Sequence, residues 1–179
     1  MGALAAFLKP FIGLAAVVAA VYLHQTYTVR TIPDDLTQME PAVRPRQMVL
    51  WRTPEGAPPR GTVVWLEHPS FPEKMLVSRV IAGPGDRVAI LKGKVYLNGQ
   101  PLAEDYASKK IDNEVVEDLV VPADHVYILN DARGGDGRPT PASDSRRLGP
   151  IPAGLIVGVS GDGAEGGEGR GAGAKKARP

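Results

Sequence analysis

The sequence predicts a mainly β fold, and three observations support this prediction. The chain of 179 residues contains 17 prolines and 21 glycines, and proline disrupts both helix interiors and central strands. Short β-branched and apolar runs alternate with turn-rich stretches between residues 33 and 160. The dipeptide Asn98-Gly99 follows one of these runs and favours a tight hairpin turn. Short strands joined by turns are therefore expected, rather than a helical bundle.

The expected strands follow one another closely along the chain. They are predicted at residues 47–51, 61–66, 74–81, 87–91, 94–97, 125–129 and 154–159. The segment Gly83-Pro84-Gly85-Asp86 predicts a turn, and because no Lys-Ser/Thr pair follows it, a phosphate-binding loop is disfavoured. The acidic stretch 112–118 is expected to be a solvated connection rather than a Ca²⁺ site. Trp51 and Trp65 are expected either to pack in the core or against a partner, or to anchor the domain at a membrane interface.

Residues 3–23 are the main helical candidate. They are apolar apart from Lys9, and a membrane-spanning helix needs roughly 20 such residues. A cleaved secretory signal has a similar layout, whereas a buried amphipathic helix would show the polar spacing that residues 11–23 lack. We expect a transmembrane anchor within residues 1–26, followed by a β domain over residues 27–160. Lys9 and Arg30 flank the apolar run and leave its orientation undecided.

The remaining composition excludes several classes of function. Lys and Arg number 21 against 20 Asp and Glu, so no nucleic-acid partner is expected. The chain has no cysteine, and its three histidines show no metal-ligand spacing, so neither a metal nor a cofactor is expected. The Gly-rich tail, residues 161–179, is predicted to be disordered. Its basic end, residues 175–178, is expected to be solvated rather than bound to anionic lipid or RNA.

A series of short motifs occurs along residues 5–160 in a definite order. They are Met39-Glu40-Pro41, Arg60-Gly61-Thr62-Val63-Val64, Ser78-Arg79-Val80-Ile81, Gly85-Asp86, Val121-Pro122-Ala123-Asp124-His125-Val126-Tyr127 and Asp144-Ser145-Arg146-Arg147-Leu148-Gly149-Pro150-Ile151. In this order the motifs resemble those of the type I signal peptidases, most closely the mitochondrial inner membrane protease branch. The resemblance implies a signal-peptidase-like domain of coiled β-sheets or a barrel behind one N-terminal transmembrane helix.

The resemblance also implies a catalytic dyad, and both positions of that dyad are altered here. In the family, the Ser of Ser-Met-x-Pro is the nucleophile and a Lys before the Arg of the later motif is the general base. Gln38 occupies the first place and Ser78 the second. An amide is a poor nucleophile, and a neutral hydroxyl does not hold a proton near pH 7. Ala142 replaces a Ser that orients the Lys, and the family's Gly-Asp-Asn is Asn130-Asp131-Ala132 here.

The rest of the site is expected to persist as a vestigial framework. Its members are Met39, Pro41, Arg79, Gly85, Asp86, Asp144, Ser145 and Arg146. Within it, Asp144 and Arg146 are expected to form or support a structural ion pair rather than a catalytic one.

Loss of the dyad from a retained framework predicts a non-catalytic structural or accessory subunit of a mitochondrial inner-membrane complex, either a respiratory-chain assembly or a protease. The resemblance implies a single-pass protein with its β domain in the intermembrane space; a bacterial membrane is the alternative. Expected partners are other inner-membrane proteins and, through residues 3–23, the bilayer.

Two other functions stay open. One is a membrane-anchored serine-type signal or presequence peptidase, with Ser78 as a relocated nucleophile. The other is a non-cleaving peptide-binding module in which Gln38 bonds an added strand.

Overall fold

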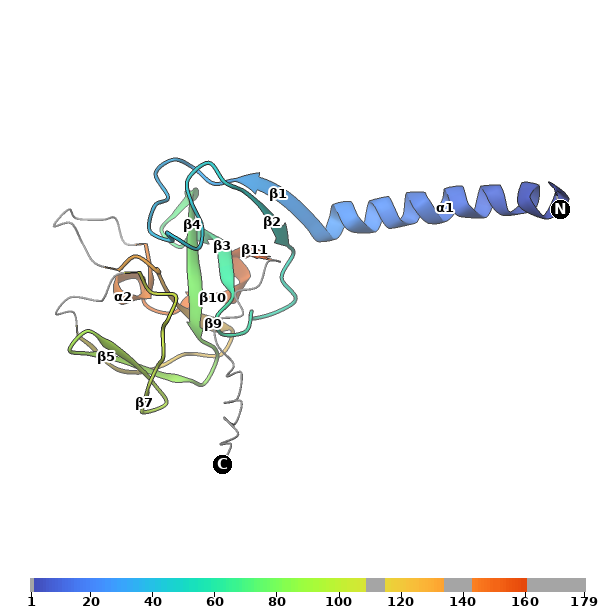
Figure 1. Cartoon of the computed structure of the whole chain (residues 1–179). Coiled ribbons are helices and arrows are strands. Elements are labelled where there is room, and N and C mark those ends of the chain that lie inside the picture. Colours follow the sequence, from blue (N-terminus) through green and yellow to red (C-terminus); the bar gives the residue numbers. More distant parts are fainter. Residues whose placement is uncertain (1, 109–114, 134–142, 161–179) are drawn as a thin grey trace, which may run out of the picture.

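Two antiparallel sheets form the body of the protein, behind a long N-terminal helix (Figure 1). The computed structural model describes residues 2–108, 115–133 and 143–160, and for residues 2–10 it describes the backbone alone. The larger sheet has seven strands in the order β1-β2-β11-β3-β4-β9-β10, and the smaller has four in the order β7-β6-β5-β8. Each sheet has two edge strands, so neither closes into a barrel, and the barrel alternative in the sequence prediction is wrong. The mainly β prediction is confirmed.

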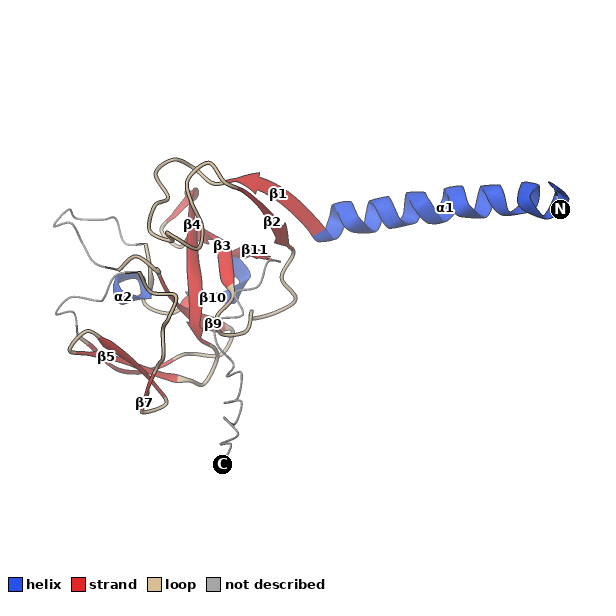
Figure 2. Cartoon of the chain, viewed as in Figure 1, coloured by secondary structure: helices blue, strands red, loops and turns tan. Residues whose placement is uncertain are grey.

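The elements have the following bounds. The larger sheet contains β1 (Tyr27–Thr31), β2 (Met48–Arg52), β3 (Val63–His68), β4 (Phe71–Ala82), β9 (His125–Leu129), β10 (Ile151–Pro152) and β11 (Ile156–Ser160). The smaller contains β5 (Arg87–Leu91), β6 (Lys94–Leu97), β7 (Gln100–Pro101) and β8 (Val116–Val120). The helices are α1 (Gly2–Thr26), α2 (Ser145–Leu148) and the 3₁₀ turn η1 (Ala153–Leu155); Figure 2 separates helices, strands and loops by colour.

Turn chemistry explains why most strands lie where the sequence predicts them. Asn98 and Gly99 both adopt positive φ, at 52° and 79°, as the tight turn between β6 and β7 requires. The pattern is less informative where strands are short or polar. The predicted solvated connection at 112–118 runs into β8, whose Val116 and Leu119 pack against the core, whereas residues 112–114 lie outside the described residues. The strand predicted from residue 154 begins only at Ile156, because η1 precedes it.

Buried side chains join the two sheets into one body. One core cluster combines Ile81 and Leu129 of the larger sheet with Val88 and Ile90 of the smaller. Two further clusters pack on the larger sheet. Trp51 is 3% exposed, and its ring centroid lies 5.5 Å from that of Trp65, so Trp51 packs in the core rather than anchoring at a membrane interface.

α1 extends away from the sheets (Figure 1). Its side chains at positions 11–25 are exposed, and the large apolar ones among them are Phe11, Ile12, Leu14, Val17, Val18, Val21, Tyr22 and Leu23. Among the residues that the structure describes, no helix combines the length and the apolar character needed to cross a membrane. The transmembrane prediction for residues 3–23 is therefore not confirmed, although a helix is present there. The predicted disordered tail, 161–179, lies outside the described residues.

Candidate functional site

The segment that carries Gln38 lies between β1 and β2 and is fixed at two points. The carbonyl of Gln38 accepts a hydrogen bond of 2.9 Å from the amide of Ala132. The next residue, Met39, is 1% exposed and belongs to the same core cluster as Val77 of β4. Gln38 itself is half-buried. These contacts place the predicted nucleophile position beside the chain that continues from β9, and near β4.

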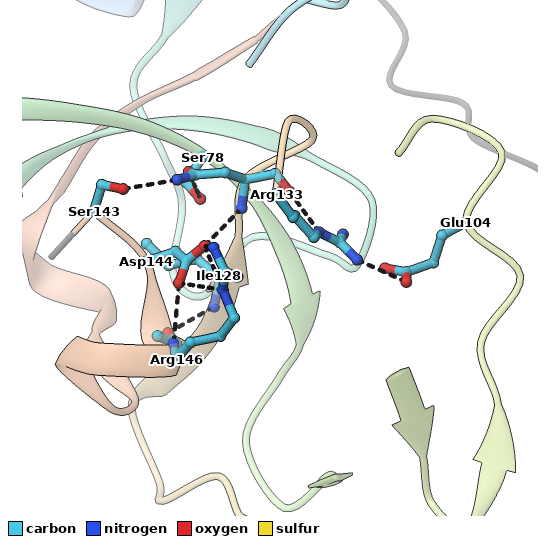
Figure 3. A network of polar contacts seen from close by, with 9 residues as sticks. Ser78, Glu104, Ile128, Arg133, Ser143, Asp144 and Arg146 are labelled. Atoms are coloured by element: carbon cyan, nitrogen blue, oxygen red, sulfur yellow. Dashed lines mark hydrogen bonds and ion pairs between the residues drawn. The ribbon is translucent and has the colours of Figure 1, made fainter. Parts of the chain in front are cut away.

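Ser78 lies on β4 and is completely buried. Its hydroxyl donates a hydrogen bond of 3.0 Å to the side-chain oxygen of Asn130, and the amide nitrogen of Asn130 donates one of 2.8 Å to the hydroxyl of Ser143 (Figure 3). Asn130 is two residues before Ala132, which holds Gln38. The structure therefore brings both altered dyad positions to the same short stretch, residues 130–132.

A buried ion pair between Arg79 and Asp131 anchors this stretch to β4. The Nε and Nη2 of Arg79 donate to the two carboxylate oxygens of Asp131 at 2.9 and 2.6 Å. The third donor, Nη1, bonds the carbonyl of Gly61 at 2.8 Å. The two side chains are only 4% and 0% exposed, so the pair is shielded from water and holds β4 against the chain leaving β9.

Asp144 and Ser145 fix the start of α2 against β9. Asp144 caps the helix by accepting from the amide of Arg146, and it forms an ion pair of 2.9 Å with the guanidinium of the same residue (Figure 3). Its carboxylate also accepts from the amide of Asn130 at 3.3 Å. The hydroxyl of Ser145 accepts from the amide of Ile128 at 2.9 Å. The ion pair expected between Asp144 and Arg146 is present, and it bonds directly to the residue that contacts Ser78.

Residues 104–108, which the sequence analysis did not single out, pack against the Arg79–Asp131 ion pair. The ring of Tyr106 lies 4.3 Å from the guanidinium of Arg79, and Ser108 donates to the carbonyl of Glu40 at 2.8 Å. Glu104 forms an ion pair of 2.7 Å with the buried Arg133 (Figure 3). Burial, followed by the nearby Glu104 carboxylate, raises the pKa of the Tyr106 phenol above its ordinary value. Residues 104–108 have no regular pattern that could have pointed to this role.

Other predicted framework residues lie elsewhere. Gly85 and Asp86 form the turn between β4 and β5, where Asp86 accepts from the amide of Gly83 and from the side chain of Asn98. Pro41 is exposed on the surface. Ala142 lies outside the described residues. Within the residues described, no group of three or more His, Cys, Asp or Glu side chains could hold a metal ion.

Among the residues that the structure describes, none is placed to activate Ser78 as a nucleophile. The hydroxyl of Ser78 donates its hydrogen bond to a neutral amide oxygen, that of Asn130. An amide oxygen cannot act as a base near pH 7. Lys74 is on the same strand but four residues away, a span of roughly 13 Å in an extended chain. It is exposed, and its ammonium lies 5.0 Å from the ring centroid of Phe71. The geometry suits a structural hydrogen-bond network and does not suit a Ser–Lys dyad.

Comparison with known proteins identifies relatives of this chain. The family model described as signal peptidase, peptidase S26, matches residues 5–161. A signal peptidase I from Leptolyngbya laminosa is 30% identical over 155 residues, which cover 82% of this chain and 73% of that protein.

Two further similarities are partial. A probable thylakoidal processing peptidase 2 of the chloroplast of Arabidopsis thaliana is 33% identical over 104 residues, which cover 58% of this chain; the chain spans 25% of that protein's length. A crystal structure of a signal peptidase I from Enterococcus faecalis is 24% identical and covers 59% of this chain and 98% of that chain, with a TM-score of 0.46.

Proposed function

The chain belongs to the signal peptidase family, peptidase S26, and from this premise we propose that it is a non-catalytic member that serves as an accessory subunit of a membrane-protein complex. The observation that carries the proposal is the state of Ser78. It stands where the family has its lysine base, it is completely buried, and it bonds a neutral amide. Gln38 stands at the nucleophile position. Both parts of the nucleophile–base pair are missing, while the buried ion pair of Arg79 and Asp131 is retained.

A cleavage assay tests the absence of activity. The full chain would be incubated in detergent micelles with a fluorogenic signal-peptide substrate, and the signal peptidase I of Leptolyngbya laminosa would serve as the positive control. We expect no product above the enzyme-free background, and the same result for Ser78→Ala. Turnover by the wild type that Ser78→Ala abolishes would overturn the proposal.

The subunit role and its location need a separate experiment. The exposed apolar side chains of α1 support attachment to a membrane. The mitochondrial inner membrane, with the β domain in the intermembrane space, is proposed from the resemblance of the motifs to that branch of the family. Mild solubilisation, native electrophoresis and mass spectrometry should find the chain comigrating with inner-membrane proteins in fixed proportion. Migration as a monomer, or recovery from a different membrane, would contradict this part.

A signal or presequence peptidase is the second candidate. It is favoured by the relatives, which are all named as peptidases. This candidate requires Ser78 to act as a nucleophile from a new position, and therefore requires it to leave its buried hydrogen bond with Asn130. The cleavage assay above decides between the two candidates.

Peptide binding without cleavage is favoured by the edge of β4. β9 pairs with β4 only from Arg79 to Ala82, whereas β3 pairs with β4 from Phe71 to Arg79. The first half of β4 therefore extends beyond β9, and an extended peptide can join such an edge as an extra strand. Met39, next to Gln38, belongs to the same core cluster as Val77 of β4, so Gln38 is the residue we choose to test. Binding of a fluorescent presequence peptide should be weakened by Gln38→Leu and unchanged by Gln100→Leu in the other sheet. No measurable binding to the wild type would exclude it.

A further inference from the structure

Asn130 is the central residue of the altered site. It is 2% exposed, and its side chain links the hydroxyls of Ser78 and Ser143. Its backbone amide donates to Asp144, and its carbonyl accepts from the Nε of Arg133 at 2.5 Å. One residue thus connects β4, the end of β9 and the entry to α2.

The two residues that meet here differ from the family pattern in opposite directions. In the motifs described above, the position of Ser78 carries a long lysine and the position of Asn130 carries a glycine without a side chain. Here the long side chain has become a hydroxyl, and the glycine has gained an amide. The hydrogen bond of 3.0 Å between Ser78 and Asn130 shows that the two changed positions are direct neighbours in the interior. A core packed to normal density accepts such a pair of changes better than either change alone.

We propose that Asn130 fills the place of the lost lysine amine and converts the former dyad into a closed, uncharged hydrogen-bond chain, Ser78–Asn130–Ser143, that stabilises the fold. This proposal deepens the proposed absence of catalysis and rests on it. The chain is neutral, so it avoids the cost of burying an ammonium group. It also implies that a long side chain at position 78 has room only when the side chain of residue 130 is removed.

The first test is a double-mutant cycle on the full chain, measured by urea unfolding. Asn130→Ala leaves a buried hydroxyl without its partner, and should raise the unfolding constant by about tenfold or more. Ser78→Ala should add little once Asn130 is gone, because the two changes break the same hydrogen bond. Thr53→Ala, at an exposed hydroxyl bonded to Gln25, is the control and should be additive with Asn130→Ala. Full additivity of Ser78→Ala with Asn130→Ala would overturn the proposal.

The second test compares the effect of Asn130→Gly on the urea midpoint in two backgrounds, where the proposal expects opposite signs. In the wild type, Asn130→Gly should lower the urea midpoint. In the background Gln38→Ser/Ser78→Lys, the same Asn130→Gly change should raise it, because it makes room for the lysine. If the lysine background does not fold, Ser78→Met provides a neutral long side chain for the same comparison. A drop of equal size in every background would overturn the proposal.

These stability measurements are independent of the cleavage assay. Cleavage by the wild type would disprove the proposed function, whereas additive or same-sign stability effects would disprove the role of Asn130. The two failures are therefore distinguishable.

Discussion

Removal of the Asp131 carboxylate by Asp131→Ala should be among the most damaging single changes in the described part of the protein. Two of the three Arg79 donor groups bond this carboxylate, and both side chains are almost fully buried. Without it, the partners of the buried guanidinium among the described residues are the Gly61 carbonyl and the Tyr106 ring, and neither carries a negative charge. Leaving one charge of a buried pair uncompensated costs about 3–5 kcal/mol. For a urea slope of about 2 kcal/mol per molar, the midpoint should fall by about 1.5–2.5 M.

Urea unfolding followed by far-ultraviolet circular dichroism measures this shift. The matched control is Asp34→Ala, which breaks the bidentate pair with Arg46; those side chains are 63% and 81% exposed, so the midpoint should barely move. The double variant Arg79→Met/Asp131→Leu removes both charges and should be more stable than Asp131→Ala alone. Equal shifts for Asp131→Ala and Asp34→Ala would refute the argument that burial determines the size of the effect.

Three further predictions use other features of the fold. Tyr106 has a raised pKa in the folded state, so above about pH 10 the unfolded chain releases this proton more readily than the folded chain. The free energy of unfolding should therefore fall as pH rises. Tyr106→Phe should reduce that alkaline loss in a series of urea titrations. Gly158→Ala would place a Cβ 2.9 Å from the Cβ of Trp51 and should cost about 1–3 kcal/mol in thermal unfolding, whereas Gly154→Ala meets nothing within 4 Å and should cost less. Gly99→Ala should destabilise the β6–β7 hairpin by about 1 kcal/mol, because Gly99 has a φ of 79°; an unchanged midpoint would contradict the assigned turn.

Local chemistry predicted the strands that have clear turns and apolar runs. The Asn98-Gly99 turn and strands β5 and β6 follow directly from residues that favour those conformations. β1 and β8 were missed because their side chains are mostly exposed, and an edge strand needs no apolar alternation. Their pairing depends on neighbours distant in the sequence, such as Thr28 with Trp51, which a local pattern does not record.

The candidate site was predicted in its positions but not in its contacts. The motifs identified Gln38 and Ser78 as the altered places, and the structure ties both to residues 130–132. The role of Asn130 could not be read from the sequence, because an Asn in a loop is equally suited to a turn. Only the distance of 3.0 Å to a buried serine distinguishes an amide that fills a space from one that is solvated.

The retained Arg79–Asp131 pair and the altered positions 78 and 130 differ in their energetic consequences, and under the proposed loss of catalysis this difference accounts for a framework that persists without its dyad. The Arg79–Asp131 pair lies in the interior, and losing either partner would leave a buried charge, so selection for folding alone is sufficient to keep both. A buried lysine base destabilises the folded state instead, because burial penalises its charged form. Under the proposed loss of cleavage, the neutral Ser78–Asn130–Ser143 chain in place of a lysine would avoid that penalty, and it pairs the side-chain and backbone groups of Asn130. On this argument the ion pair should survive in non-catalytic relatives, whereas the residues at positions 78 and 130 should change together.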